Sequence, residues 1–285
     1  MARTEAQHEG PAMTGHSEQE KADDPLAVSL GMGVDSVAML VGMHQRGVRP
    51  DWIGHAQVGN EWPETYAYRP TIDAWLARVG FPSIVDVRYR VQRPKHGHYD
   101  TLEENCLVNQ TLPGISFGRK SCSIKWKGQP LDAAVRAYFA PHIRRGGKVS
   151  RAIGYDAGPC DAKRGTSESS GPWRWIYPLR EWGWDRERCV LEIEREIGAV
   201  PHKSACWFCR SMKPAEVLEL ARNHPDLARR AVALEDRARP RLIQISGLWG
   251  RGTKGTRGGE AKPGSWRDFL TVHAPHVLPP TDGES

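Results

Sequence analysis

The sequence lacks any apolar run near the ~18 residues that a membrane span needs, although 39% of its 285 residues are hydrophobic. Residues 1–24 are polar, without the apolar centre of a secretory signal, and we interpret them as a disordered tail. Cysteine is also scarce, with six residues in the chain. These absences favour a cytoplasmic protein, where cysteines serve as ligands or free thiols more often than as disulfides.

Two common phosphate-binding signatures are missing as well. Residues 26–30 form an apolar run typical of a buried strand, Gly31–Ser36 interrupts it, and helical spacing resumes at Val37. No Gly-Lys-Ser/Thr follows, which excludes the P-loop, and Ser36 stands where the dinucleotide fingerprint requires glycine. A strand, a glycine turn and a helix start still make an anion site, because helix N-terminal N–H groups face the ligand. The alternative is a tight turn that binds nothing.

Strand and helix patterns alternate over much of the chain. Strands are expected at 52–58 and 81–89, with an amphipathic helix ending at Val79 between them. This alternation predicts an α/β domain of ~200 residues with a mainly parallel sheet and crossover helices. Ligands then bind beyond the carboxyl ends of the strands, where Gly31–Ser36 and Gly59–Glu64 both fall. Further helices are expected at 131–139, 185–197, 214–239 (interrupted at His224-Pro225) and 266–273.

Several segments between residues 26 and 209 carry recognisable motifs. They are G-M-G-V-D-S at 31–36, like S-G-G-x-D-S; G-N-E-W-P-E-T-Y at 59–66, like F-P-E-T-Y; C-S-I-K-W-K-G-Q-P-L at 122–131, like C-C-x-x-R-K-x-x-P-L; W-I-Y-P-L-R-E-W at 175–182, like N-P-L-x-x-W; and S-A-C-W-F-C at 204–209, like G-C-x-x-C. In this order they resemble the PAPS/APS (phosphoadenosine phosphosulfate) reductase family, a branch of the PP-loop ATP pyrophosphatase superfamily.

The resemblance implies a fold, a domain division and a nucleotide site. The fold is a three-layer α/β sandwich with a mainly parallel sheet, like the adenine nucleotide alpha hydrolases, plus a helical C-terminal region. The nucleotide domain spans 25–200, a Cys-x-x-Cys lobe 201–245, and a flexible basic tail with a short helix 246–285. ATP (or PAPS or APS) with Mg²⁺ is the implied ligand. The implied nucleotide-binding residues are Gly31, Gly33, Asp35, Ser36, Asn60, Glu61, Gly154, Lys163 and Arg164.

The departures from the family pattern bear on the reaction. Ser123 follows Cys122 where the family has a second cysteine, and no cysteine follows Cys209. Sulfonucleotide reduction by the usual route needs such a late thiolate, so the chain looks closer to PP-loop branches that thiolate tRNA or DNA. Some of those branches bind an iron–sulfur cluster through three cysteines.

The cysteines at 122, 206 and 209 are therefore candidate metal ligands. Cys206-x-x-Cys209 places two thiolates within reach of one metal, and three thiolates suit a [4Fe–4S] cluster with one iron open to sulfide or substrate. Cys160 is a candidate fourth ligand. The alternatives are zinc, held by the three cysteines with His202 or a fourth cysteine, and a thiol pair that binds no metal.

The surroundings of the other thiols and of Cys122 lead to two further expectations. Lys120, Lys125 and Lys127 flank Cys122 in the sequence and are expected to lower its pKa. Cys106 and Cys189 fall in helical patterns and are predicted to be small buried hydrophobes.

The leading hypothesis is an ATP-dependent sulfurtransferase with Asp35, Ser36 and Cys122 as its catalytic residues. An acceptor oxygen attacks the α-phosphorus, pyrophosphate leaves, and sulfur then displaces AMP. Expected partners are a tRNA, DNA or small-molecule acceptor and a sulfur donor such as a cysteine desulfurase, with a homodimer left open. The net charge of +6 and the basic glycine-rich residues 250–259 permit nucleic acid without requiring it.

Two other functions are left open. One is reduction of PAPS or APS to sulfite with an external thiol. The other is a non-catalytic nucleotide sensor, because Met32 has a longer side chain than the glycine of the family pattern and is expected to alter phosphate contact.

Overall fold

The computed structural model describes residues 24–91, 97–116, 119–162, 164, 169–252 and 263–278. Its centre is a five-stranded sheet with the strand order β3-β2-β1-β6-β7, and every neighbouring pair is parallel. The predicted parallel sheet is thereby confirmed. The strands are β1 (Leu26–Ser29), β2 (Trp52–Ala56), β3 (Ile84–Val87), β6 (Val149–Ala152) and β7 (Trp173–Ile176).

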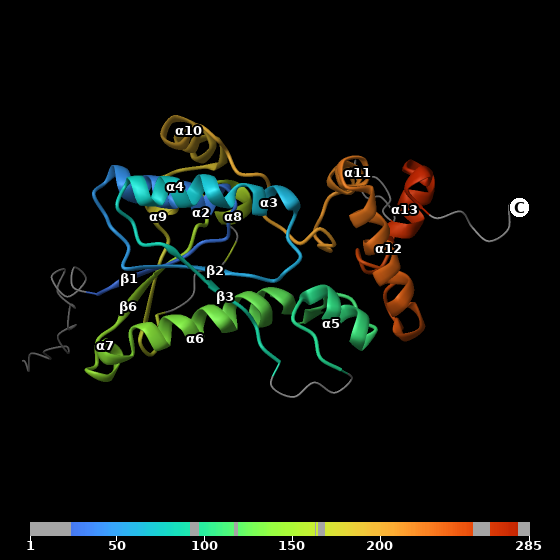
Figure 1. Ribbon diagram of the computed structural model, residues 1–285, viewed down its shortest axis with the longest axis horizontal. Coiled ribbons are helices and arrows are strands. Elements are labelled where there is room, and N and C mark those ends of the chain that lie inside the picture. Colours follow the sequence, from blue (N-terminus) through green and yellow to red (C-terminus); the bar gives the residue numbers. More distant parts are fainter. Residues whose placement is uncertain are drawn as a thin grey trace, which may run out of the picture.

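Helices cover both faces of this sheet, which gives three layers (Figure 1). One face carries α2 (Val34–Gln45), α4 (Arg69–Arg78) and α10 (Arg186–Ile197), and the other carries α6 (Gln129–Tyr138) and α7 (Ala140–Arg144). Short helices connect these layers at the edges of the sheet. They are α3 (Pro63–Ala67), α8 (Pro159–Ala162) and α9 (Pro178–Glu181).

The central strand β1 is apolar over its first three residues, Leu26–Val28, because both of its faces are buried there. Val28 packs into the core beneath α2 and α4, whereas Ala27 packs into the opposite core beside α6. Successive strand residues point to opposite faces, so a strand covered on both sides reads as a continuous apolar run. The strand order reverses between β1 and β6, and the loops that follow two such neighbouring strands border a crevice at the carboxyl edge of the sheet.

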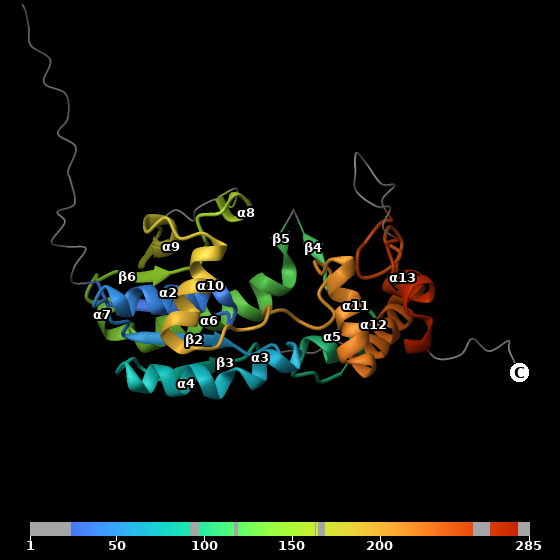
Figure 2. The same ribbon diagram turned by 90° about the horizontal axis from the view of Figure 1, so that it is seen from above.

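A second core lies at one end of the sheet, among the C-terminal helices (Figures 1 and 2). It contains α11 (Pro214–Asn223), α12 (Pro225–Ala238) and α13 (Trp266–His273), packed with α5 (Leu102–Asn109). The predicted interruption at His224-Pro225 is confirmed, because proline cannot continue α11 but suits the first turn of α12. Helix α5 thus shares its core with the C-terminal helices although it lies within residues 25–200.

Smaller elements complete the described chain. A two-stranded hairpin of β4 (Ile115–Ser116) and β5 (Arg119–Lys120) precedes a π-helical segment, Ser123–Gly128. Two 3₁₀ turns span Arg239–Arg241 and Pro275–Val277. None of the helices in the described ranges has both the length and the apolar character of a membrane span.

A buried carboxylate ties the C-terminal helices together. Glu235 of α12 accepts hydrogen bonds from four donors, with distances of 2.6–3.0 Å. The donors are the backbone N–H groups of Leu248, Trp266 and Arg267 and the Ser265 hydroxyl. The carboxylate therefore anchors both the 246–250 turn and the first turn of α13.

We expect Glu235→Ala to lower the free energy of unfolding by at least ~3 kcal/mol, because several buried N–H groups lose their acceptor. Urea unfolding followed by circular dichroism measures this loss. The matched control is Asp236→Ala, since Asp236 is partly exposed and pairs with Arg267 at the surface, where removal costs at most ~1 kcal/mol. Equal losses in the two variants would contradict the anchoring role.

Candidate functional site

Residues Gly31–Ser36, hereafter the phosphate loop, join β1 to α2 at the carboxyl edge of the sheet. The Ser36 hydroxyl accepts a hydrogen bond from Gly31 N (3.1 Å) and donates one to Gly33 O (3.0 Å), which holds the loop as a closed turn. Gly33 is the N-cap of α2 in an extended conformation and has no side chain to cover the helix end. The N–H groups of the first turn therefore point into the crevice, as an anion site requires.

Met32 has the left-handed backbone conformation, with a φ of 59°, at the position where the family pattern has glycine. Its side chain is 1% exposed and packs in the core between the sheet and α2. Burial of a methionine side chain contributes ~1.5–3 kcal/mol, which offsets the ~1–2 kcal/mol cost of the left-handed conformation. The side chain therefore leaves the phosphate loop open, contrary to the expectation that it alters phosphate contact.

Gly154 follows β6 and packs directly against the start of α2. A Cβ atom at this position would lie 3.0 Å from the Asp35 carbonyl group and 3.0 Å from Ser36 Cα. These are backbone atoms of a buried helix, so they cannot move aside without displacing the phosphate loop. Gly154 thus allows the loops after β1 and β6 to meet in the crevice.

We expect Gly154→Ala to weaken ATP binding about tenfold or more, because the added methyl group displaces the first turn of α2. Isothermal titration calorimetry with Mg·ATP measures the affinity. Gly128→Ala is the control, since a Cβ there would meet only Ser123 O, at an ordinary 3.5 Å. An unchanged affinity in a folded Gly154→Ala protein would contradict the close-packing role.

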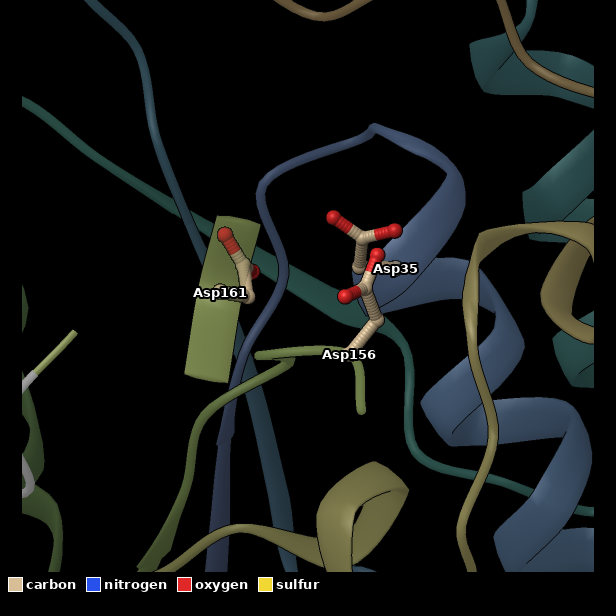
Figure 3. Close-up of side chains that lie close together, drawn as sticks. All are labelled: Asp35, Asp156 and Asp161. Atoms are coloured by element: carbon tan, nitrogen blue, oxygen red, sulfur yellow. The ribbon is translucent and has the colours of Figure 1, made fainter. Parts of the chain in front are cut away.

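Three carboxylates meet beside the phosphate loop (Figure 3). Asp35 comes from the first turn of α2, Asp156 from the loop after β6 and Asp161 from α8, and one oxygen of each lies within 4.8 Å of the others. Asp156 is 8% and Asp161 7% exposed. We call these residues the aspartate triad. Of these three residues, the sequence motifs indicate Asp35 alone.

The electrostatics of the aspartate triad favour a bound cation. Burial raises the pKa of Asp35, the Arg186 guanidinium 2.7 Å away lowers it, and the neighbouring Asp156 and Asp161 carboxylates raise it again. Asp156 Oδ1 accepts from Gly158 N (2.9 Å), and Asp161 pairs with Arg164 at 3.0 Å. Carboxylate oxygens are the ligands that Mg²⁺ prefers, so the donor set fits the cation that the resemblance implies.

The Cys-x-x-Cys segment is hydrogen-bonded to the loop that follows β2. Glu61 and Cys206 form an isolated antiparallel bridge. Trp62 N donates to Ala205 O (3.1 Å), and Trp207 N donates to Asn60 O (3.0 Å). A segment about 145 residues further along the chain is thereby held at the carboxyl edge of the sheet.

The same segment also contacts the phosphate loop. The Ser204 hydroxyl donates a hydrogen bond to Gly31 O, and a Cβ atom on Gly33 would lie 3.3 Å from Ser204 Cβ. Two residues beyond Ser204 is Cys206. The phosphate loop and the Cys-x-x-Cys segment are therefore in direct contact.

Cys122, Cys206 and Cys209 all pack against the hydrophobic core of the C-terminal helices. Burial raises the pKa of Cys122, and the neighbouring Cys209 thiol raises it further. Burial also raises the pKa of Cys206, with contributions from Cys209 and Cys122. Cys122 is half-buried and lines a cavity of about 290 Å³ together with Lys125 and Trp126. The trio thus has a route to solvent on the Cys122 side.

The predicted lowering of the Cys122 pKa is wrong. Lys120 and Lys127 do act to lower the pKa of Cys122, but burial and the Cys209 thiol outweigh them. Lys125 lies instead over the Tyr89 ring, 5.0 Å from its centroid. Sequence neighbours of a cysteine do not reveal how far the thiol is removed from water.

The candidate zinc ligands are not gathered around one point within the described residues. Ligands at ~2.3 Å from a tetrahedral zinc ion lie about 3.8 Å apart. Within the described ranges, no three ligand atoms of Cys122, Cys206, Cys209 and His202 gather within 4.8 Å of one another, as those of the aspartate triad do. His202 instead lies 3.3 Å from Glu219 and packs on Trp62. The cluster and the zinc site therefore both stay predictions.

Asn60 and Glu61 are both engaged in contacts within the protein. The Asn60 amide donates to Glu103 Oε2 (3.1 Å) and accepts from Glu103 N (2.9 Å), which joins the loop to α5. Glu61 is buried, and its Oε1 pairs with Lys127 Nζ at 2.6 Å. No described residue donates a hydrogen bond to Glu61 Oε2. The two residues therefore position the thiol segment, and their predicted contact with nucleotide stays a prediction.

The remaining candidates divide between described and undescribed positions. Arg164 pairs with Asp161 and lies over the Tyr155 ring, 5.0 Å from its centroid. Lys163 lies outside the described residues, as does the side chain of Cys160. Cys106 and Cys189 are buried, as predicted, and burial raises the pKa of each to about 12.

Comparisons with known proteins add little to this geometry. No family model and no curated protein sequence matches the chain. Among solved structures, the chain is similar to the U34-tRNA thiolase NcsA from Methanococcus maripaludis with its [4Fe–4S] cluster, at 12% sequence identity and a TM-score of 0.37, over 92% of this chain and 84% of that one. A likeness this low has no weight for function, which is inferred below from the chain's own residues.

Proposed function

We propose that the protein is an ATP-dependent sulfurtransferase of the PP-loop type, which adenylates an acceptor and replaces the activated oxygen with sulfur. The observation that carries this proposal is the attachment of the Cys-x-x-Cys segment to both nucleotide-side loops, through the Ser204–Gly31 hydrogen bond and the Glu61–Cys206 bridge. A nucleotide site and a set of thiols within one crevice suit a reaction in which activation and sulfur transfer share one acceptor.

The phosphate loop binds the triphosphate. First-turn N–H groups of α2 donate to the phosphate oxygens, and the helix dipole favours their negative charge. The aspartate triad would hold Mg²⁺, which neutralises charge on the departing pyrophosphate. The acceptor oxygen attacks the α-phosphorus, the bond to pyrophosphate breaks, and the acceptor is left as an adenylate with AMP as its leaving group.

Cys122, Cys206 and Cys209 would hold a [4Fe–4S] cluster, which supplies the sulfur atom when bound. Lys127 lies close enough to lower the pKa values of both Cys122 and Cys206, so its charge stabilises their thiolates as ligands. The cavity beside Cys122 admits the acceptor to this end of the site.

We further propose a nucleic acid as the acceptor and a cysteine desulfurase as the source of sulfur. The net charge of +6 supports a polyanionic partner. The basic glycine-rich stretch 250–259, a second candidate contact, lies mostly outside the described residues.

Anaerobic purification tests the proposal. We expect ~4 irons and ~4 sulfides per chain, a broad visible absorption band and, after reduction, an EPR signal of a [4Fe–4S] cluster. Pyrophosphate release from ATP is then measured with RNA, DNA or small thiolation acceptors. Zinc in place of iron, or AMP formed without any acceptor, would count against sulfur transfer.

A further inference from the structure

Arg186 reaches from the far side of the crevice to the phosphate loop. It is the first residue of α10, and its Nη1 lies 2.7 Å from Asp35 Oδ1. The two residues are 151 positions apart in the chain. The Arg186 side chain is 52% exposed, so it is an arginine at the mouth of the nucleotide site.

The backbone that carries Arg186 is held firmly against α2. Cys189 and Ile193 of α10 are buried in the core beneath the sheet helices, and Gln45 of α2 donates to Glu192 Oε2 at 2.8 Å. The Asp185 side chain caps the N-terminus of α10 by accepting from Arg188 N. The backbone at the start of α10 is therefore fixed by packing and capping, whereas the Arg186 side chain is half-exposed.

The guanidinium pairs with one of the three carboxylates of the aspartate triad. Asp156 and Asp161 are each satisfied by a neighbour on their own segment, Gly158 N and Arg164, whereas Asp35 is paired across the crevice. A metal ion bound to Asp35 and the Arg186 guanidinium repel each other and compete for the same carboxylate.

We propose that Arg186 is an exchangeable counter-ion of the nucleotide site. It neutralises Asp35 when no nucleotide is present, and on binding of Mg·ATP it moves to the pyrophosphate portion of the nucleotide. The guanidinium fork matches phosphate oxygens as well as it matches a carboxylate, and the phosphates at the N-terminus of α2 lie next to Asp35. This inference rests on the proposed nucleotide binding and adds a phosphate-binding residue that the motifs do not mark.

Arg186→Ala is expected to move two affinities in opposite directions. Mn²⁺ binding in the absence of nucleotide, measured by EPR, tightens about threefold or more, because a competing cation is gone. Mg·ATP binding, measured by calorimetry, weakens about tenfold, because a phosphate contact is lost, whereas AMP binding changes less than about threefold. The control is Arg195→Ala on the same helix, whose side chain is similarly exposed and pairs with Glu192.

The outcomes separate this inference from the proposed function. If the parent protein binds no Mg·ATP, both are wrong. If the parent binds Mg·ATP and Arg186→Ala binds it equally well, only the role of Arg186 is wrong. A parallel loss of Mn²⁺ and ATP affinity would show a structural role, and an equal loss for AMP and ATP would exclude contact with the pyrophosphate portion.

Discussion

Cys206→Ser is expected to remove nearly all bound iron, with a loss of more than about tenfold in iron and sulfide per chain. Cys206 pairs with Glu61 and lies two residues after Ser204, which bonds to Gly31 of the phosphate loop. A serine hydroxyl is a poor substitute for thiolate in an iron–sulfur site. Iron and sulfide quantitation after anaerobic purification, with the visible spectrum, measures the loss.

Cys189→Ala is the matched control for this prediction. Cys189 is a buried thiol in the core between α2 and α10, and it packs with none of the three candidate ligands. Its removal creates a small cavity and lowers stability, but iron content is expected to stay at the parent level. A Cys206→Ser protein that keeps its iron would show that the three thiols do not form the metal site.

Asp35→Asn is expected to lower the rate of pyrophosphate release by about 10²–10³-fold, comparable to loss of one electrostatic stabiliser of a transition state. The change keeps the shape of the side chain but removes one negative charge from the aspartate triad. Cation binding weakens as a result, and the charge on the departing pyrophosphate is less well neutralised. A coupled pyrophosphate assay at saturating ATP measures the rate.

Asp86→Asn serves as the control for Asp35→Asn. Asp86 lies on β3, pairs with Arg69 at the surface and is partly exposed, so its charge is expected to matter little to the reaction. Retention of the full rate in Asp35→Asn would remove the aspartate triad from the mechanism. If Asp35→Asn does not fold, the rate of pyrophosphate release is measured instead in Asp161→Asn, which removes a charge from the same triad.

Local features of the site could be predicted because they depend on neighbours in sequence. The apolar run at 26–30, the glycines that follow it and the helical spacing from Val37 predict a strand, a turn and a helix start, and all three are present. The helix expected at 185–197 likewise begins after its Asp185 cap. Periodicity and capping depend on residues close together in the sequence, so both can be recognised from the sequence alone.

Other features were missed because they arise between distant segments. No motif marks Asp156, Asp161 or Arg186. Each becomes a candidate site residue only because the fold places it next to Asp35. The pKa of Cys122 was misjudged for the same reason, since flanking lysines are visible in sequence and burial is not. Met32 departs from the family pattern, yet its side chain turns into the core.

The sequence by itself determined the class of fold, the position of the phosphate loop and the three cysteines worth following. Only the tertiary structure decided that the strand order reverses between β1 and β6, which brings Gly154 against Asp35 and gathers the aspartate triad. It also decided that Ser204 bonds to Gly31. The physical reason is that hydrophobic periodicity specifies elements one at a time, whereas a site at a sheet edge depends on how loops from separate strands converge.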